Sequence, residues 1–236
     1  MARGESPAWK DEMTRRPHSR RAGFSGPASV TPEPLPEDTI AAFDFDGTLT
    51  THDSFTAFLK WRAGPSGYAR GIARLAPAIA AYLVHHNRGT LKAAAAREFL
   101  RGATRAELDD DARRFAKEQA ASLLRPDAVA TWRHWRAQGA KLVIVTASPD
   151  FLVAPFARGL GADTLLGSAL AFDGAGRATG ALFGPNCRGK EKVLRLQTEF
   201  GPNVRLAAAY GDTSGDRDML KIADEKGYRV FKAKPA

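Results

Sequence analysis

Short apolar runs separated by longer polar or mixed segments mark the chain from about residue 39 onward. Three runs are rich in Ala, Val, Ile, Leu or Phe and end at polar residues or glycine: 39–43, 141–145 and 204–210. Continuous apolar runs of this length predict buried strands of a parallel sheet, because helices cover both faces of such a sheet. Residues 169–182, with Asp173-Gly174 in the middle, predict a β-hairpin.

The segment between the first two runs, residues 55–125, has a helical pattern instead. It is rich in Ala, and Thr104 with Glu107 has the spacing of a capping box at a helix start. Asp53 precedes an apolar helical stretch and predicts its N-cap. We therefore expect an α/β fold: a Rossmann-like parallel sheet core from residues 39–54 and 126–236, with residues 55–125 inserted as a helical cap domain.

The first 38 residues differ from the rest in composition. They are polar and contain proline, with six basic and six acidic residues and no apolar periodicity. They predict a disordered extension, or an overlong translation start with Met13 as the alternative. No apolar segment follows the basic residues, so we expect no secretory signal. The single cysteine, Cys187, leaves no intrachain disulfide and fits a reducing cytoplasm, where we expect the protein to be.

Polar side chains that could take part in catalysis or ligand binding follow each predicted strand. Because the carboxyl ends of parallel strands meet at one edge of a sheet, we expect these side chains to lie together. The first strand is followed by Asp44 and Asp46, which we expect to point in one direction because alternate strand residues do so. The candidates after the later strands and before a helix are Thr146, Ser148, Lys190, Lys192, Asp212 and Asp216.

Two carboxylates crowded at a strand end repel each other unless a cation or a shared proton relieves them, and this predicts an acidic Mg²⁺ site. The Asp-x-Asp pattern alone is weak, since glycosyltransferases use it for a metal-bound sugar nucleotide. An acid pair, a hydroxyl, a lysine and a second acid pair, in that order, are typical of a site that handles phosphate. The sequence therefore predicts phosphoryl chemistry.

With these motifs the chain resembles the haloacid dehalogenase-like phosphatases. The four motifs are 44–48, Thr146, Lys192 or Lys190, and 211–212 with Asp216, and the resemblance covers about residues 39–231. The long insertion after the first motif is similar to the phosphoserine phosphatase-like branch, subfamily IB. Within that branch, residues 44–61, 189–194 and 228–231 look like the phosphatidylglycerophosphatase C type.

The resemblance implies a role for each motif residue. Asp44 is the expected nucleophile that forms an aspartyl phosphate, and Asp46 is the expected general acid and base. The Asp44 carboxylate, the Asp46 backbone carbonyl and Asp212 are the expected Mg²⁺ ligands. Support for that metal shell is expected from Asp216.

Four residues are candidates for binding the substrate phosphate: Thr146, Ser148, Lys192 and Lys190. Lys192 fits the Gly-x-x-Lys spacing of the family, whereas Lys190 fits a looser reading of the loop. Ser148 precedes Pro149 and is explained equally well as the cap of the next helix.

Charge in the insertion suggests a substrate class. Residues 56–125 hold thirteen Lys or Arg against six Asp or Glu, which accounts for most of the net charge of +9. Such a field attracts an anionic substrate or an anionic membrane surface. The nearly apolar segment 71–84 predicts either an interfacial helix or, equally, a buried cap helix or oligomer contact. Nucleic acid is not expected as a partner, because the charge is not interleaved with an aromatic platform.

The favoured function is a Mg²⁺-dependent phosphomonoesterase acting on phosphatidylglycerophosphate or a related phospholipid, peripheral at the inner face of the membrane. A soluble phosphomonoester such as phosphoserine is the alternative substrate. Less favoured alternatives are a phosphomutase, a receiver-like signalling domain and a non-catalytic binding protein. Asp46 and the insertion argue against the receiver, which needs neither. The sequence makes no prediction of oligomeric state.

Overall fold

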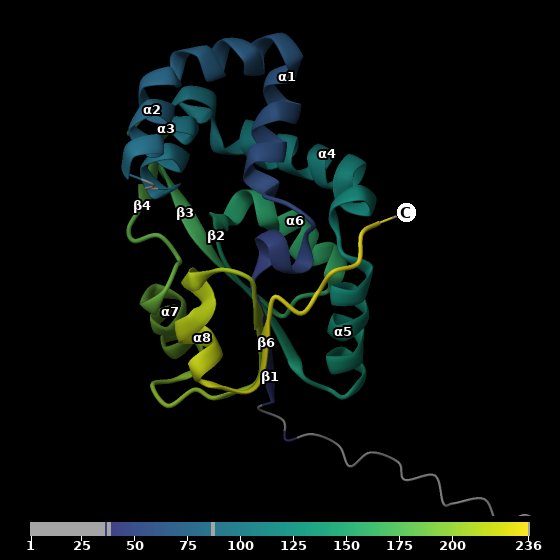
Figure 1. Ribbon diagram of the computed structural model, residues 1–236. Helices are drawn as coiled ribbons and strands as arrows, with labels where there is room; N and C mark the ends of the chain where they lie inside the picture. The colour runs from purple at the N-terminus through teal and green to yellow at the C-terminus, as the bar shows by residue number, and fades with distance from the viewer. Residues whose placement is uncertain (1–35, 37–38, 86–87, 236) are drawn as a thin grey trace, which may run out of the picture. The chain divides into compact units, whose positions relative to one another are not determined.

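A six-stranded sheet with the order β4-β3-β2-β1-β5-β6 runs through the part of the chain that the computed structural model describes, Pro36, 39–85 and 88–235 (Figure 1). These residues belong to one compact unit, Pro34–Ala236. The predicted N-terminal extension, residues 1–38, lies outside the described residues except for Pro36. The strands are β1 (Ile40–Phe43), β2 (Lys141–Pro149), β3 (Thr164–Phe172), β4 (Ala178–Phe183), β5 (Leu206–Gly211) and β6 (Ala223–Tyr228).

Neighbouring strands are parallel except for β3 and β4, which form an antiparallel hairpin at one edge of the sheet. The predicted Rossmann-like sheet and the predicted hairpin are therefore confirmed. The strand expected at 141–145 is longer than predicted, because β2 continues to Pro149 with an irregularity after Val145.

Helices connect the strands and cover both faces of the sheet (Figure 1). They are α1 (Ser54–Arg74), α2 (Ala76–His85), α3 (Arg88–Leu100), α4 (Arg105–Leu123), α5 (Pro126–Ala137), α6 (Asp150–Leu160), α7 (Lys190–Phe200) and α8 (Arg217–Lys221). Successive residues of β1 point to opposite faces. Ala41 and Phe43 belong to an apolar cluster with residues of α5 and α6, and Ile40 and Ala42 belong to one with residues of α7 and α8. The uninterrupted apolar run of β1 follows from this burial on both faces.

The insertion predicted at residues 55–125 is helical and contains α1 to α4, and α5 then leads to β2. Asp53 caps α1 by accepting a hydrogen bond from the Thr56 backbone N–H, and Thr104 and Glu107 form the expected capping box of α4. Phe58 of α1 and Phe115 of α4 lie with their ring centroids 5.5 Å apart. Aromatic contacts therefore pack the helices of the insertion against one another.

The apolar segment 71–84 is not one helix. Its first residues end α1, Leu75 is the C-cap, and the rest forms α2. Pro77 explains the break, because proline has no backbone N–H and its ring clashes with the carbonyl four residues earlier in a continuous helix. No helix in the described part of the chain has both the length and the apolar character needed to cross a bilayer.

Two adjacent chain segments join the insertion to the core. Thr50 forms an isolated antiparallel bridge with Leu124, and the Thr51 N–H donates to the Leu123 carbonyl at 2.8 Å. The Arg125 N–H donates to the Leu49 carbonyl at 2.9 Å, and its guanidinium donates to the Thr50 carbonyl. We call residues 49–51 and 123–125 the hinge, since any movement of the insertion against the core passes through them.

Candidate active site

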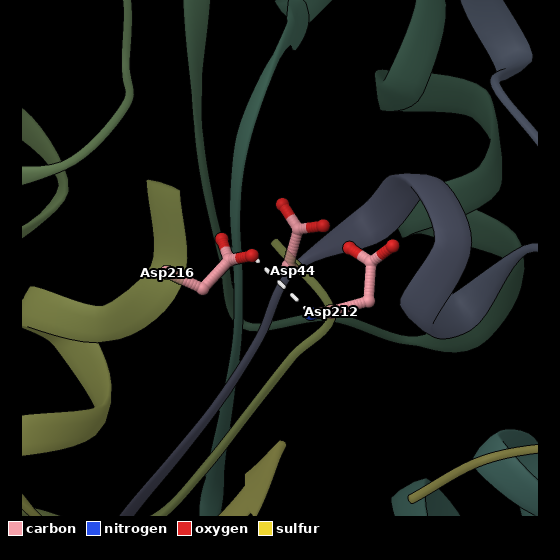
Figure 2. Close-up of side chains that lie close together, drawn as sticks. All are labelled: Asp44, Asp212 and Asp216. Carbon is pink, nitrogen blue, oxygen red and sulfur yellow. Dashed lines mark hydrogen bonds between the residues drawn. The ribbon is translucent and has the colours of Figure 1, made fainter. Parts of the chain in front are cut away.

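The carboxyl ends of β1 and β5 deliver three carboxylates to one place (Figure 2). Phe43 of β1 pairs with Tyr210 of β5, so Asp44 and Asp212 follow at neighbouring positions of the same sheet edge. Asp216 comes from the short turn η3 (Ser214–Asp216) just beyond β5. One oxygen from each of Asp44, Asp212 and Asp216 lies within 4.8 Å of the others. The predicted acidic cluster therefore exists in the fold.

Lys192 of α7 links two of these carboxylates. Its Nζ lies 2.6 Å from Asp44 Oδ1 and 2.7 Å from Asp216 Oδ1, and it also donates to the Val145 carbonyl at 2.5 Å. The Lys192 side chain is 1% exposed. Lys190, the alternative considered from the sequence, is exposed at the start of α7. Of the two lysines, the structure brings Lys192 to the acidic cluster.

Burial and charge act on this cluster in opposite directions. Burial raises the pKa of Asp44 to about 7, outweighing Lys192, which lowers it. The pKa of Asp216 is lowered: burial by itself raises it, but the Lys192 charge and hydrogen bonds from Thr213 prevail. Burial also opposes the charge of Lys192, yet the two carboxylates raise its pKa. The lowered pKa of Asp216 and the raised pKa of Lys192 both favour a charged Lys192–Asp216 pair beside Asp44.

Asp46 lies beyond strand β1, so the strand alternation on which its predicted direction rested does not apply to it. Strand β1 ends at Phe43, and Asp46 lies in the tight turn η2 (Phe45–Leu49). Its Oδ1 accepts a hydrogen bond from the Ser54 backbone N–H at 2.6 Å, and its Oδ2 accepts one from the Ser148 hydroxyl. Both oxygens are thus fixed by donors from α1 and β2.

The pKa of Asp46 is raised, first by burial and then by the charge of Asp53, while Lys92 and the two serine donors lower it. A raised pKa suits a carboxyl that must carry a proton at neutral pH. Lys92 of α3 reaches this side of the site through an ion pair with Asp53, with Nζ 2.5 Å from Oδ2. No sequence motif marks Lys92, which lies in an Ala-rich helix of the basic insertion.

The two hydroxyl candidates of β2 have different partners. The Thr146 Oγ1 accepts a hydrogen bond from the Ser148 N–H at 3.0 Å, which leaves the Thr146 hydroxyl proton for another acceptor. The Ser148 hydroxyl donates to Asp46. The next helix has Pro149 at its N-cap and no side-chain cap there, so Ser148 is not the helix cap that the sequence offered as an alternative.

Asp212 is the carboxylate with an unsatisfied oxygen. Its Oδ1 is buried without a hydrogen-bond partner, and burial and the nearby Asp216 raise its pKa. Gly47 approaches it so closely that a Cβ there would lie 2.3 Å from Asp212 Oδ2, and Gly47 has a φ of +78°. A crowded set of hard oxygen donors with an orphaned oxygen fits a small divalent cation. The residues present therefore fit the Mg²⁺ that the sequence predicts.

A comparison with known families gives this fold and site their class. Residues 41–221 match the family of haloacid dehalogenase-like hydrolases, and the chain belongs to that family. The family resemblance of the four motifs is thereby confirmed, and with it the expectation of a hydrolase.

Individual proteins are also similar to this chain. The chain is 64% identical over 214 residues to the protein CicA of Caulobacter vibrioides, in both strain NA1000 / CB15N and strain ATCC 19089, covering 91% of this chain and 96% of CicA. A solved protein of unknown function from Bordetella pertussis Tohama I is 26% identical, with a TM-score of 0.62, over 78% of this chain and 86% of that one.

A phosphoserine phosphatase solved as a phospho-aspartyl intermediate analogue has the same fold. Its TM-score is 0.54 at 19% identity, and the match covers 82% of this chain and 88% of that one. This likeness supports the Rossmann-like core of the family.

Proposed function

We propose that the protein is a Mg²⁺-dependent phosphomonoesterase that works through an aspartyl phosphate on Asp44. The observation that carries the proposal is the buried Lys192 between Asp44 and Asp216 at the carboxyl edge of the sheet. Membership of a hydrolase family and a fold shared with phosphoserine phosphatases support a phosphatase. The neighbour with a phospho-aspartyl intermediate analogue supports covalent catalysis by an aspartate.

In the first step, an oxygen of Asp44 attacks the phosphorus atom and the bond from phosphorus to the leaving oxygen breaks. Asp46 gives its proton to the leaving alkoxide, which departs as an alcohol. Hydrogen bonds from Ser54 and Ser148 hold the Asp46 carboxyl in place for this transfer. The raised pKa of Asp46 keeps a protonated fraction available.

In the second step, water attacks the phosphorus atom of the aspartyl phosphate and Asp46 takes the proton of that water. The bond between phosphorus and the Asp44 oxygen breaks, which releases inorganic phosphate and restores both carboxyls. The Thr146 hydroxyl would donate to a phosphoryl oxygen during both steps, whereas Lys192, whose three N–H groups are held by Asp44, Asp216 and the Val145 carbonyl, would act through its positive charge. Ser148 acts through Asp46 as a positioning residue, since its hydroxyl is already used there.

Asp44, Asp212 and the Asp46 backbone carbonyl would hold Mg²⁺, with Asp216 in support, and enzymes of this family generally use that ion. Bound Mg²⁺ would supply positive charge that keeps Asp44 ionised and neutralises the oxygens of the transferred phosphoryl group. The orphaned Asp212 Oδ1 supports this assignment, because a cation would satisfy it.

The substrate that we propose is a phospholipid phosphate monoester such as phosphatidylglycerophosphate, hydrolysed at the cytoplasmic face of a membrane. Helix α2 supports this choice. Residues 75–84 contain no charged side chain, yet Leu83 is 66% exposed and Val84 is 72% exposed. The insertion that carries them has a large excess of basic residues. An apolar surface with cationic surroundings complements an anionic lipid bilayer.

Phosphate release from phosphatidylglycerophosphate in mixed micelles, beside phosphoserine and a panel of soluble phosphomonoesters, tests the proposal. Mg²⁺-dependent release with preference for the lipid is expected, and Asp44→Asn serves as the blank. Preference for a soluble ester would keep the mechanism and overturn the lipid substrate. Release that persists in Asp44→Asn would refute the nucleophile.

Membrane contact through α2 has a separate test, co-sedimentation with anionic vesicles. We expect Leu83→Ser with Val84→Ser to lower the bound fraction several-fold. The matched control is Leu194→Ser with Val230→Ser, which removes a similar pair of exposed apolar side chains elsewhere, 54% and 52% exposed. Equal binding by both double variants, or no binding by the wild type, would exclude α2 as the contact.

A further inference from the structure

A cavity lined by positively charged side chains lies outside the candidate active site. It has a volume of about 480 Å³ and is formed by α4 of the insertion together with α5 and α6 of the core. None of the carboxylates or hydroxyls of the candidate active site lines it. We call it the α4–α6 groove. It is not explained by the proposed phosphatase chemistry, and the inference below does not depend on that chemistry.

Four cationic side chains line the α4–α6 groove, and no acidic side chain does: Arg113, Lys117, Arg133 and Arg158. Arg113 pairs with Asp110 at 3.3 Å. In the described residues, Lys117, Arg133 and Arg158 have no carboxylate partner. Like charges gathered in one cavity repel one another, so the groove is arranged for an anion that brings its own negative charge.

The nearby acids that could neutralise these cations are engaged elsewhere. Asp110 contacts Arg113 and Arg114, and Glu118, the neighbour of Lys117 in sequence, accepts from the Trp61 indole at 2.6 Å. Arg158 has a partial structural explanation, because it lies in the last turn of α6, where a cation interacts favourably with the helix dipole. Lys117 and Arg133 have none.

The remaining lining of the α4–α6 groove is apolar. It includes Ala120, Leu124, Val129, Pro155 and Leu160. The polar side chains of the lining are all donors, because arginine and lysine have no acceptor. A ligand that matches this surface has hydrogen-bond acceptors and negative charge at one end and an apolar body at the other.

We propose that the α4–α6 groove binds a small amphipathic anion: a carboxylate or phosphate head held by Lys117, Arg133 and Arg158, with a short apolar chain on Leu124 and Val129. Such a ligand would touch α4 of the insertion and α5 and α6 of the core at once. Leu124 also belongs to the hinge, through its bridge with Thr50. The site therefore lies where a ligand would connect the insertion to the core.

Octanoate is the probe, and calorimetric titration of the full chain is the measurement. Octanoate combines the charge and the chain, acetate has the charge alone, and octanol has the chain alone. We expect octanoate to bind at least tenfold more tightly than either. Equal affinity for acetate would mean an adventitious ion only, and no binding of octanoate would overturn the proposal.

Variants locate the binding. Arg133→Ala with Arg158→Ala is expected to weaken octanoate binding at least tenfold, whereas Arg205→Ala with Lys226→Ala, two exposed cations outside the groove, leaves it unchanged. Arg133→Lys with Arg158→Lys keeps the charge and should retain most of the affinity. Equal loss in the two alanine pairs would show a general charge effect and refute the site.

Gly159 allows a test that removes no charge. It lines the groove within α6, its φ is not in the left-handed region, and a Cβ there would meet no atom within 4 Å. Gly159→Leu therefore fills the groove without backbone strain and should abolish octanoate binding. Circular dichroism and thermal melting establish that each variant is folded. Undiminished binding in a folded Gly159→Leu would place octanoate outside the groove.

Discussion

Lys192 is the residue on which the electrostatics of the site depend. It is buried with two carboxylates and a backbone carbonyl around its ammonium group, and it is the ion that compensates the crowding of Asp44 and Asp216. The sequence left Lys190 and Lys192 as alternatives, since both lie in one loop-to-helix segment. Burial separates them, and burial depends on how α7 packs against the sheet, which spacing alone does not give.

Replacing Lys192 by methionine is expected to lower the free energy of unfolding by about 3–5 kcal/mol, because two buried carboxylates lose their shared partner. Lys190→Met, at an exposed position, is expected to change it by no more than about 0.5 kcal/mol. Urea denaturation followed by fluorescence measures both. Similar losses in the two variants would contradict the assignment of Lys192.

Asp46→Asn tests the general acid. Turnover is expected to fall on the order of 10²–10⁴-fold with Mg²⁺ affinity unchanged. A general acid works in its protonated form, so the wild-type rate falls as pH rises through the pKa of Asp46, which burial raises. That alkaline limb of the pH–rate profile should disappear in Asp46→Asn. A variant that retains the rate and the limb, but binds Mg²⁺ weakly, would make Asp46 only a ligand.

At the scale of elements, short-range sequence patterns predicted the helix caps but not the orientation of the side chains that follow a strand. The capping box of Thr104 with Glu107 and the cap of Asp53 follow from short-range spacing and are present in the fold. The direction of Asp46 could not be derived in this way, because β1 ends at Phe43 and Asp46 lies in the tight turn that follows. The ion pair of Lys92 with Asp53 and the α4–α6 groove arise from contacts between distant segments, which no pattern in one sequence displays.

The hairpin β3–β4 packs against α3 through a glycine, and this contact can be tested. Gly180 has a φ of +80°, and a Cβ there would lie 2.3 Å from Arg97 Cα in α3. Gly180→Ala is therefore expected to destabilise the protein by on the order of 1–3 kcal/mol, since a backbone atom cannot move aside as a side chain can. Gly174→Ala, where a Cβ meets no atom within 4 Å, is the control and should be close to neutral. Thermal melting compares the two, and equal melting temperatures would contradict the close approach.

At the scale of the whole described unit, insertion and core share one apolar interior. Phe58 of α1 contacts Phe151 of α6, with ring centroids 5.8 Å apart, and Phe115 of α4 contacts Phe156 of α6 at 6.0 Å. The sequence suggested a core and a separate cap, because the helical insertion interrupts the strand pattern. The strand and helix pattern did not predict the aromatic contacts between insertion and core. These contacts make the stability of the insertion depend on that of the core.

Metal binding should be visible in this global stability. In the absence of metal, burial and the neighbouring Asp216 raise the pKa of Asp212. A carboxyl whose pKa is raised by folding contributes stability below its unfolded pKa and loses it as pH rises. At pH 7 without metal, Asp212→Asn is therefore expected to be at least as stable as the wild type.

Mg²⁺ should reverse that order. A ligand that binds only the folded state stabilises it by about 2.7 kcal/mol at a concentration of 100 times its Kd, so the wild-type melting temperature should rise with Mg²⁺ and fall again with a chelator. Asp212→Asn should not respond, whereas Asp224→Asn, at an exposed carboxylate paired with Arg205, should respond like the wild type. Differential scanning calorimetry measures all three proteins with and without Mg²⁺. An equal rise in Asp212→Asn would remove Asp212 from the metal site, and no rise in the wild type would remove the metal site itself, because the stabilisation requires only binding and not turnover.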